Sequence, residues 1–280
     1  MKTVGLLGYP LGHSASPAMH NAAFRYVGMN AQYIPFEVPP GEIIEAVEGF
    51  RALNFLGFNV TVPYKEAVLE HLDDVTKLAK VIGAVNTVVN RDGKLTGYNT
   101  DGPGFIESLK EDAGFDPKGK SAVVIGAGGA GRAISIMLAE CAATSVVIAD
   151  IDLEKGEELA EYIRNDFNCK CEALLPADMA KAVEKGHLLV NASPVGMHPK
   201  DNECPLPGKV KIPPKTLVYD LVYNPQETLL LRLAKESKAR GVSGLGMLVR
   251  QGALAFSIFT DEEAPIEVMW NAAREIVTKK

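Results

Sequence analysis

The residues best suited to acid–base chemistry are a lysine and an aspartate that each follow a short β-rich run in the first hundred residues. Lys65 comes after the run 58–62, and Asp101 comes after the run 94–98. A lysine beside a carboxylate supplies a proton donor or acceptor together with a partner that positions it. Asn86 would add hydrogen bonds to a polyhydroxylated substrate. Taken singly, Lys65 fits an ordinary surface charge, Asp101 a helix N-cap and Asn86 a turn residue, so the prediction depends on the combination.

Further polar groups lie close to the ends of the predicted strands. Asn59 and Thr61 alternate along one strand and therefore share a face. Ser14 and Ser16 follow the first predicted strand and precede a helix, where two hydroxyls and the positive end of the helix dipole would suit a carboxylate. We expect Ser16 to N-cap the helix that begins at Pro17 whether or not it also binds a ligand, whereas Ser14 has no expected capping role.

A glycine-rich segment, Gly126-Ala-Gly-Gly-Ala-Gly131, separates an apolar run at 123–125 from a predicted helix. A second apolar run, 146–149, ends in Asp150. This strand, turn, helix, strand and acid pattern is typical of a dinucleotide site, in which the glycines allow a tight turn and close approach of the backbone to a pyrophosphate. The helix N-terminus offers N–H groups to the phosphates. Asp150 is placed to accept hydrogen bonds from a ribose 2′-hydroxyl.

Hydrophobic periodicity predicts an α/β fold in which strands alternate with helices. After Gly241 two more helices come too late to belong to the nucleotide-binding sheet, and they could return to the first domain. The predicted strands are 4–7, 33–38, 58–62, 84–90, 94–98, 122–125, 146–149, 172–175, 188–191 and 217–220, with 84–90 and 94–98 forming a hairpin. The main predicted helices are 17–27, 42–53, 130–142, 154–166, 227–239, 245–259 and 266–278, and 197–215 is a proline-rich surface loop.

Composition excludes several classes of protein. The 280 residues are 47% hydrophobic and 23% charged, with a net charge of −6 and no cluster of Lys and Arg, which argues against nucleic acid as a partner. No apolar run reaches the ~20 residues of a membrane span, and the early glycines and proline of the first residues predict a strand rather than a signal peptide. Of the four cysteines, only Cys169 and Cys171 are close in sequence. We therefore expect a cytoplasmic protein with reduced thiols and no metal site.

Eight segments, in order along nearly the whole chain, together resemble the shikimate dehydrogenase family. They are His13-Ser-x-Ser-Pro17, Asn59-Val-Thr-Val-Pro-x-Lys65, Gly83-Ala-Val-Asn-Thr87, Asn99-Thr-Asp101-Gly, Gly126-Ala-Gly-Gly-Ala-Gly131, Asn191-Ala-Ser-Pro-x-Gly196, Asp220-x-x-Tyr-Asn-Pro225 and Gly246-Met-x-x-x-Gln251-Gly-Ala.

The resemblance implies reversible hydride transfer between a nicotinamide dinucleotide and shikimate or 3-dehydroshikimate, in chorismate and aromatic amino acid biosynthesis. It implies a Rossmann-type nucleotide-binding domain at 103–240 and a discontinuous α/β substrate domain with a mainly parallel sheet at 1–102 and 241–280. Lys65 and Asp101 would be catalytic. The implied substrate-binding residues are Ser14 and Ser16 for the carboxylate, Asn59, Thr61, Asn86, Asp101 and Gln251 for the ring hydroxyls, and Tyr223. The implied dinucleotide-binding residues are Gly126, Ala127, Gly128, Gly129, Ala130, Gly131, Asp150, Asn191, Ser193, Val222, Gly244 and Met247.

The segment after the second strand of the nucleotide-binding domain departs from the family pattern. The family commonly has Asn-Arg-Thr-x-x-Arg, which suits the 2′-phosphate of NADP, whereas this chain has Asp150-Ile-Asp-Leu-Glu-Lys155. A carboxylate near that phosphate would cost on the order of a few kcal/mol at an effective dielectric constant near 20. The sequence therefore predicts a preference for NAD, with NADP possible.

Two other functions remain open at this stage. NAD use within the family is associated with quinate oxidation, so a quinate or dual quinate/shikimate dehydrogenase is one alternative. A catalytically silent nucleotide-binding sensor is another, and the intact pair of Lys65 and Asp101 argues against it. The chain would act as a monomer or homodimer.

Overall fold

The computed structural model describes residues 1–12, 14–208 and 210–278, and His13, which opens one of the motifs above, lies outside the described residues. The chain divides into two compact units, and each is described by itself. The first comprises Met1–Gly104 with Leu248–Lys280, and the second comprises Phe105–Met247.

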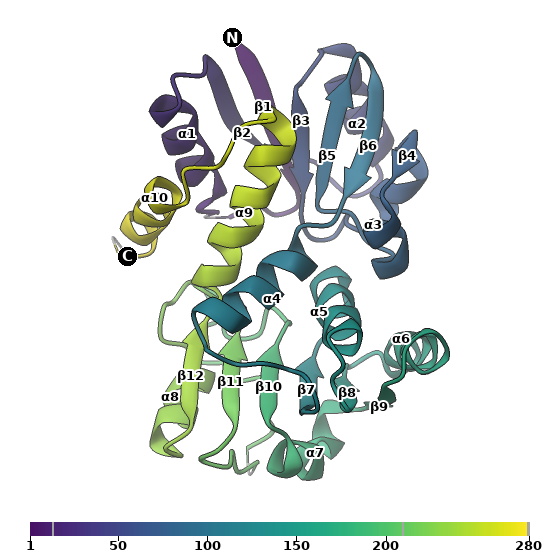
Figure 1. Ribbon diagram of the computed structural model, residues 1–280, viewed down its shortest axis with the longest axis vertical. Helices are drawn as coiled ribbons and strands as arrows, with labels where there is room; N and C mark the ends of the chain where they lie inside the picture. Colours follow the sequence, from purple (N-terminus) through teal and green to yellow (C-terminus); the bar gives the residue numbers. More distant parts are fainter. Residues whose placement is uncertain (13, 209, 279–280) are drawn as a thin grey trace. The chain divides into compact units, whose positions relative to one another are not determined.

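The first unit is built on a mixed sheet with the strand order β2-β1-β3-β5-β6-β4 (Figure 1). The pairs β1–β2, β1–β3 and β4–β6 are parallel, whereas β3–β5 and β5–β6 are antiparallel. The strands are β1 (Lys2–Gly8), β2 (Ala31–Glu37), β3 (Gly57–Val60), β4 (Asp74–Val75), β5 (Thr87–Arg91) and β6 (Lys94–Tyr98).

Helices cover both faces of this sheet because β3 carries apolar or small residues on each side. Phe58 packs against Phe50 of α2, with ring centroids 4.9 Å apart. Gly57 faces the other side, where a Cβ would lie 2.7 Å from the ring of Phe259 in α9, so the glycine allows that helix to approach. The helices of the unit are α1 (Ser16–Tyr26), α2 (Ile43–Ala52), the 3₁₀ turn η1 (Ala67–His71), α3 (Lys77–Ile82), α9 (Leu245–Thr260, shared with the second unit) and α10 (Ile266–Thr278), which packs on α1.

The predicted hairpin determines where the polar residues of the first unit gather. Asn59 at the end of β3 pairs with Thr87 at the start of β5, and Thr87 pairs with Tyr98 at the end of β6. Because β1 runs parallel to β3, its end lies at this same edge. The segments around Ser14, Lys65, Asn86 and Asp101 therefore all leave or enter the sheet at one edge.

The second unit contains an all-parallel sheet with the strand order β12-β11-β10-β7-β8-β9. The strands are β7 (Ser121–Ile125), β8 (Ser145–Ala149), β9 (Lys170–Leu174), β10 (Leu188–Asn191), β11 (Leu217–Asp220) and β12 (Arg240–Ser243). The helices are α4 (Asp101–Glu111, which begins in the first unit), α5 (Gly129–Glu140), α6 (Leu153–Asp166), the 3₁₀ turn η2 (Pro176–Asp178), α7 (Ala180–Lys185) and α8 (Leu229–Glu236). The α/β class predicted from the sequence is correct, with a Rossmann-type sheet in this unit.

One strand of the second sheet was not predicted. Residues Arg240–Ser243 form β12, which pairs in parallel with β11. Residues 241–247 therefore lie with the second unit, a few positions beyond the domain boundary expected at 240. The loop at 197–215 has no helix or strand among its described residues, but Leu206 and Ile212 are buried in the core of this unit.

Candidate active site

Lys65 and Asp101 form a close ion pair in the first unit. The Nζ atom of Lys65 donates a hydrogen bond to Oδ2 of Asp101 at 2.6 Å. The two side chains are 14% and 6% exposed, so the pair is shielded from bulk water while the lysine retains some access to solvent. The antiparallel hairpin makes this pair possible, because it returns the chain to the edge at which β3 ends. The geometry can support proton exchange with a ligand that reaches Lys65.

Asn86 extends the pair into a buried hydrogen-bond network. Its Nδ2 atom donates to Oδ1 of Asp101 at 2.9 Å and to Oγ1 of Thr100 at 2.8 Å. Its Oδ1 atom accepts from the backbone N–H of Thr100 at 2.8 Å. Gln251 joins from α9, with its Oε1 3.4 Å from Nδ2 of Asn86. Asp101 thus accepts from both Lys65 and Asn86, which fixes the orientation of its carboxylate.

Gly104 explains how Gln251 comes so close to this network. A Cβ at Gly104 would lie 2.7 Å from the backbone nitrogen of Gln251, so α4 and α9 can cross at this point only because the residue is glycine. Gln251 was predicted from the sequence as a site residue, whereas Gly104 and Thr100 were not. Asn99-Thr-Asp101-Gly was the available signal, because a polar run at a strand end places successive side chains in one buried turn.

Ser14 and Ser16 take different local roles from those expected. The first residue of α1 is Ser16, its N-cap is Ala15, and no side chain caps the helix. The expectation that Ser16 caps the helix is therefore wrong. It is instead Oγ of Ser14 that accepts the backbone N–H of Ser16, at 3.2 Å. The helix begins one residue earlier than predicted, at Ser16, and its N-cap is therefore Ala15.

Thr61 also lies at this edge of the sheet. Its N–H donates to the carbonyl of Leu7 at 2.8 Å, and its methyl group occupies space that a Cβ at Gly8 would fill. Tyr223, the remaining predicted substrate residue, follows β11 in the second unit. The roles of these residues remain predictions.

The glycine loop of the second unit has the close contacts that its motif predicts. Gly126 has φ +107°, in the region that favours glycine. A Cβ at Gly131 would lie 1.9 Å from the carbonyl oxygen of Gly126, so helix α5 can pack against the end of β7 only with glycine there. At Gly128, the N-cap of α5, a Cβ would meet no protein atom within 4 Å. Gly128 therefore leaves open space beside the N-terminus of the helix, which fits the approach of a pyrophosphate.

Asp150 points into this loop. Its Oδ2 atom accepts the backbone N–H of Ala127 at 2.5 Å, and its Oδ1 atom accepts that of Asp152 at 2.9 Å. The parallel pairing of Ile125 with Ala149 brings the two segments together. Two N–H dipoles therefore stabilise the carboxylate, and the amide of Ala127, predicted to contact the cofactor, is engaged by Asp150. Ile151 is 88% exposed beside it.

Asn191 and Ser193 form a network with Asp220, a residue with no role predicted from the sequence. Nδ2 of Asn191 donates to Oδ1 of Asp220 at 2.9 Å, and Oδ1 of Asn191 accepts from Oγ of Ser193 at 2.6 Å. Asp220 also accepts from Thr228 Oγ1 at 2.6 Å and from the N–H of Val222 at 3.1 Å. Burial raises the pKa of the Asp220 carboxyl. These bonds hold the loops that follow β10 and β11 in place.

Gly244 and Met247 complete the predicted dinucleotide residues. A Cβ at Gly244 would lie 2.1 Å from the carbonyl oxygen of Leu221, so the turn between β12 and α9 requires glycine to pass the end of β11. Met247 is 6% exposed at the start of α9. The contact of these two residues with a nicotinamide remains a prediction.

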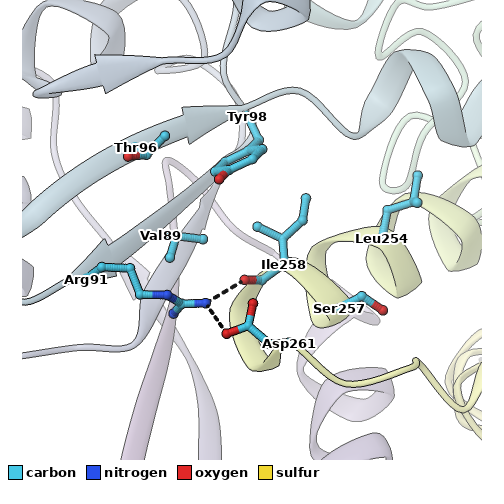
Figure 2. Close-up of a pocket in the computed structure, with 8 residues that line it drawn as sticks. All are labelled: Val89, Arg91, Thr96, Tyr98, Leu254, Ser257, Ile258 and Asp261. Atoms are coloured by element: carbon cyan, nitrogen blue, oxygen red, sulfur yellow. Dashed lines mark hydrogen bonds and ion pairs between the residues drawn. The ribbon is translucent and has the colours of Figure 1, made fainter.

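A separate cavity of about 450 Å³ lies beside α9 in the first unit (Figure 2). Its lining residues are Val89, Arg91, Thr96, Tyr98, Leu254, Ser257, Ile258 and Asp261. Arg91 closes one side, because it bonds to the carbonyl of Ile258 at 3.1 Å and to Asp261 at 2.8 Å. None of these lining residues belongs to the Lys65 network.

Two observations bear on metal and thiol groups in the parts of the chain that the structure describes. No group of three or more His, Cys, Asp or Glu residues in these parts could hold a metal ion. Burial raises the pKa of the Cys171 thiol to about 12, which keeps it protonated near neutral pH. Among the described residues, no helix has the length and apolar character needed to cross a membrane.

A parallel sheet with a glycine turn at its carboxyl edge, together with a buried lysine–aspartate pair in the other unit, defines the class as a dinucleotide-dependent oxidoreductase. Residues 6–88 match the model of the shikimate dehydrogenase substrate binding domain, and residues 244–274 match that of the shikimate 5′-dehydrogenase C-terminal domain. A shikimate dehydrogenase (NADP(+)) of Methanopyrus kandleri is 48% identical over 274 residues, covering 97% of this chain and 94% of that protein. The chain belongs to the shikimate dehydrogenase family.

Solved structures agree with this assignment. A shikimate dehydrogenase in complex with NADP⁺ has a TM-score of 0.90 and 41% identity, covering 99% of this chain and 96% of that chain. The shikimate 5-dehydrogenase of Listeria monocytogenes, in complex with shikimate and NAD, has a TM-score of 0.88 and 38% identity, with the same coverage of 99% and 96%.

The predicted preference for NAD is wrong. Relatives 44–48% identical over nearly the whole chain, from Methanopyrus kandleri, Desulforamulus reducens and Moorella thermoacetica, are named as NADP(+) enzymes. The prediction assumed that Asp150 faces the ribose and repels a 2′-phosphate. In the structure its carboxylate is instead turned onto the N–H groups of Ala127 and Asp152.

Proposed function

We propose that this chain catalyses the reversible oxidation of shikimate to 3-dehydroshikimate with NADP as the dinucleotide. The observation that carries the proposal is the buried pair of Lys65 and Asp101, 2.6 Å apart at the sheet edge of the first unit, where Asn59, Thr61 and Asn86 also lie. NADP, when bound, supplies the hydride acceptor at C4 of its nicotinamide ring. The glycine loop fits that group, because it leaves open space at Gly128 beside the N-terminus of α5.

Lys65 exchanges the proton on the oxygen at C3 of the substrate as the hydride leaves that carbon. Asp101 holds the lysine and, with Asn86 and Gln251, offers polar groups to neighbouring hydroxyls. Ser14 and Ser16 bind the substrate carboxylate at the start of α1. The pairing of a proton donor with a fixed carboxylate is the usual requirement for this kind of proton transfer.

Cofactor choice in this proposal follows the orientation of Asp150. With its carboxylate held by two backbone N–H groups, the loop after β8 opposes a 2′-phosphate less than its sequence suggests. Lys155, in the first turn of α6, and Arg132, in the first turn of α5, add positive charge on the adjoining elements. Basic side chains near the adenosine ribose favour the phosphate of NADP.

A steady-state assay with shikimate and quinate, each with NADP and with NAD, tests the proposal. We expect the highest kcat/KM with shikimate and NADP. A higher kcat/KM for quinate with either dinucleotide would identify a quinate dehydrogenase. Absence of turnover with all four combinations, despite tight dinucleotide binding, would identify a sensor.

A further inference from the structure

Tyr33 is a buried residue of β2 whose hydroxyl contacts Asn59, a predicted substrate residue. Its ring is 2% exposed, and its hydroxyl donates to Oδ1 of Asn59 at 2.8 Å. Since the strand order is β2-β1-β3, the side chain spans β1 to reach Asn59 on β3. Asn59 is itself 7% exposed, and it is one of the residues that we assign to the ring hydroxyls of shikimate.

The hydrogen bonds of Asn59 leave little freedom to its amide. The Nδ2 atom donates to the backbone carbonyl of Asn86 at 2.9 Å and to Oγ1 of Thr87 at 2.9 Å, which uses both of its hydrogens. A carbonyl can only accept, so the amide nitrogen must face Asn86. The oxygen must then face Tyr33, whose hydroxyl occupies one of its two lone pairs. One acceptor position remains, and Asn59 can therefore offer a ligand only an acceptor.

Tyr33 is well placed to impose this arrangement because three contacts hold it. Its ring stacks on His20 with centroids 4.4 Å apart and an interplanar angle of 5°. The side chain of Asn21 clamps the main chain of Tyr33. Its Oδ1 atom accepts from the N–H of Tyr33 at 2.8 Å, and its Nδ2 atom donates to the carbonyl of Tyr33 at 3.0 Å. Burial lowers the pKa of His20 to about 3, so the stacked imidazole stays neutral near neutral pH. The hydroxyl therefore has a fixed position relative to β3.

We propose that Tyr33 is a positioning residue for substrate recognition, which fixes Asn59 as an acceptor for one ring hydroxyl of shikimate. This inference rests on the proposed function. Tyr33 does not take part in proton transfer. Its hydroxyl holds the Asn59 oxygen at one position before the substrate arrives, so the substrate hydroxyl meets a preorganised partner. Loss of the Tyr33 hydroxyl should weaken substrate binding and leave the reaction at Lys65 nearly intact.

Tyr33→Phe tests this directly, because it removes one oxygen and keeps the stacked ring. We expect KM for shikimate to rise about tenfold, with kcat and KM for NADP changed less than about threefold. In an Asn59→Ala background, the same substitution should produce no further rise in KM, since the residue through which it acts is gone. Tyr219→Phe is the matched control, because it removes an equally buried hydroxyl, bonded to Ser108 in the second unit at 2.8 Å. It should leave KM for shikimate unchanged.

A second variant covers the case in which Tyr33→Phe does not fold. Asn21→Ala removes the clamp on the main chain of Tyr33 and keeps its hydroxyl, and KM for shikimate should rise about threefold, again only when Asn59 is present. An unchanged KM in Tyr33→Phe, or an equal rise with and without Asn59, overturns this inference alone. A wild-type enzyme that does not oxidise shikimate overturns the proposed function and this inference together.

Discussion

The two units present their functional groups in opposite ways. The first unit relies on side chains, since Lys65, Asn86 and Asp101 donate and accept through their own polar atoms. The second relies on the absence of side chains, since Gly128 and Gly131 expose backbone and allow close approach. A site of the first kind fails when atoms are removed, whereas a site of the second kind fails when atoms are added. Substitutions can therefore distinguish the two units by the direction of the change in volume.

The largest expected effect comes from removing atoms in the first unit. Lys65→Ala should lower kcat for shikimate by about hundredfold or more, the range for a lost general acid or base. Dinucleotide affinity, measured by titration of the fluorescence of the reduced cofactor, should stay within about twofold. Near-normal turnover would remove Lys65 from the mechanism.

Adding a single methyl group at either of two glycines sharpens the comparison in the second unit. Gly131→Ala should lower both Tm and NADP affinity, because its Cβ would lie 1.9 Å from the Gly126 carbonyl and overpacking costs ~1–3 kcal/mol. Gly128→Ala meets no protein atom within 4 Å, so it should lower NADP affinity about tenfold without lowering Tm. Equal losses of Tm in the two variants would contradict the assignment of open space at Gly128.

Asp150 is one exception in the second unit, because its side chain binds two backbone N–H groups. Asp150→Ala removes the acceptor of two N–H groups and should weaken NADP and NAD by a similar factor, about tenfold. The ratio of the two dissociation constants should change less than about threefold. A variant that gains affinity for NADP while losing affinity for NAD would show that Asp150 faces the ribose after all.

The smallest effect on activity is expected for His20→Phe, which should change the unfolding free energy instead. Its pKa is lowered by burial from 6.5 to about 3, so the unfolded chain binds a proton below pH 6.5 that the folded chain does not. Unfolding free energy should then fall as pH drops from 6.5 towards 3, by ~1.4 kcal/mol per pH unit at most. His20→Phe should flatten this part of the profile in urea titrations. A slope identical to that of the wild type would show that His20 does not control it.

Much of the fold was predictable because its signals are local. The Arg91-Asp92-Gly93 turn has positive φ at Asp92 and Gly93, and its sequence alone indicated the hairpin that brings Asp101 back to Lys65. The edge strand β12 was missed because its residues alternate poorly, with two exposed and two half-buried positions. A short edge strand carries little hydrophobic periodicity.

The features that could not be predicted depend on contacts between distant segments. The side chain of Asp150 turns towards Ala127, a backbone donor that lies 23 positions earlier in the chain. Tyr33 reaches Asn59 across an intervening strand, and no spacing rule links those positions. Residue types and strand ends thus indicated which groups gather at the sheet edge, but the orientation of each group depends on contacts that form only in the folded chain.

The discontinuity of the first unit has a consequence for synthesis on the ribosome. Helix α1 packs on α10, and β3 packs on α9, yet the whole of the second unit is translated between them. At about 5–20 residues per second, that interval lasts roughly 7–30 s. During this time the apolar surface around Phe24 and Gly57 stays exposed, because the helices that cover it, α9 and α10, have not yet been synthesised. The nascent chain is therefore most vulnerable to aggregation before the end of α10 emerges, and the second unit, whose sheet strands are contiguous in the chain, can fold first.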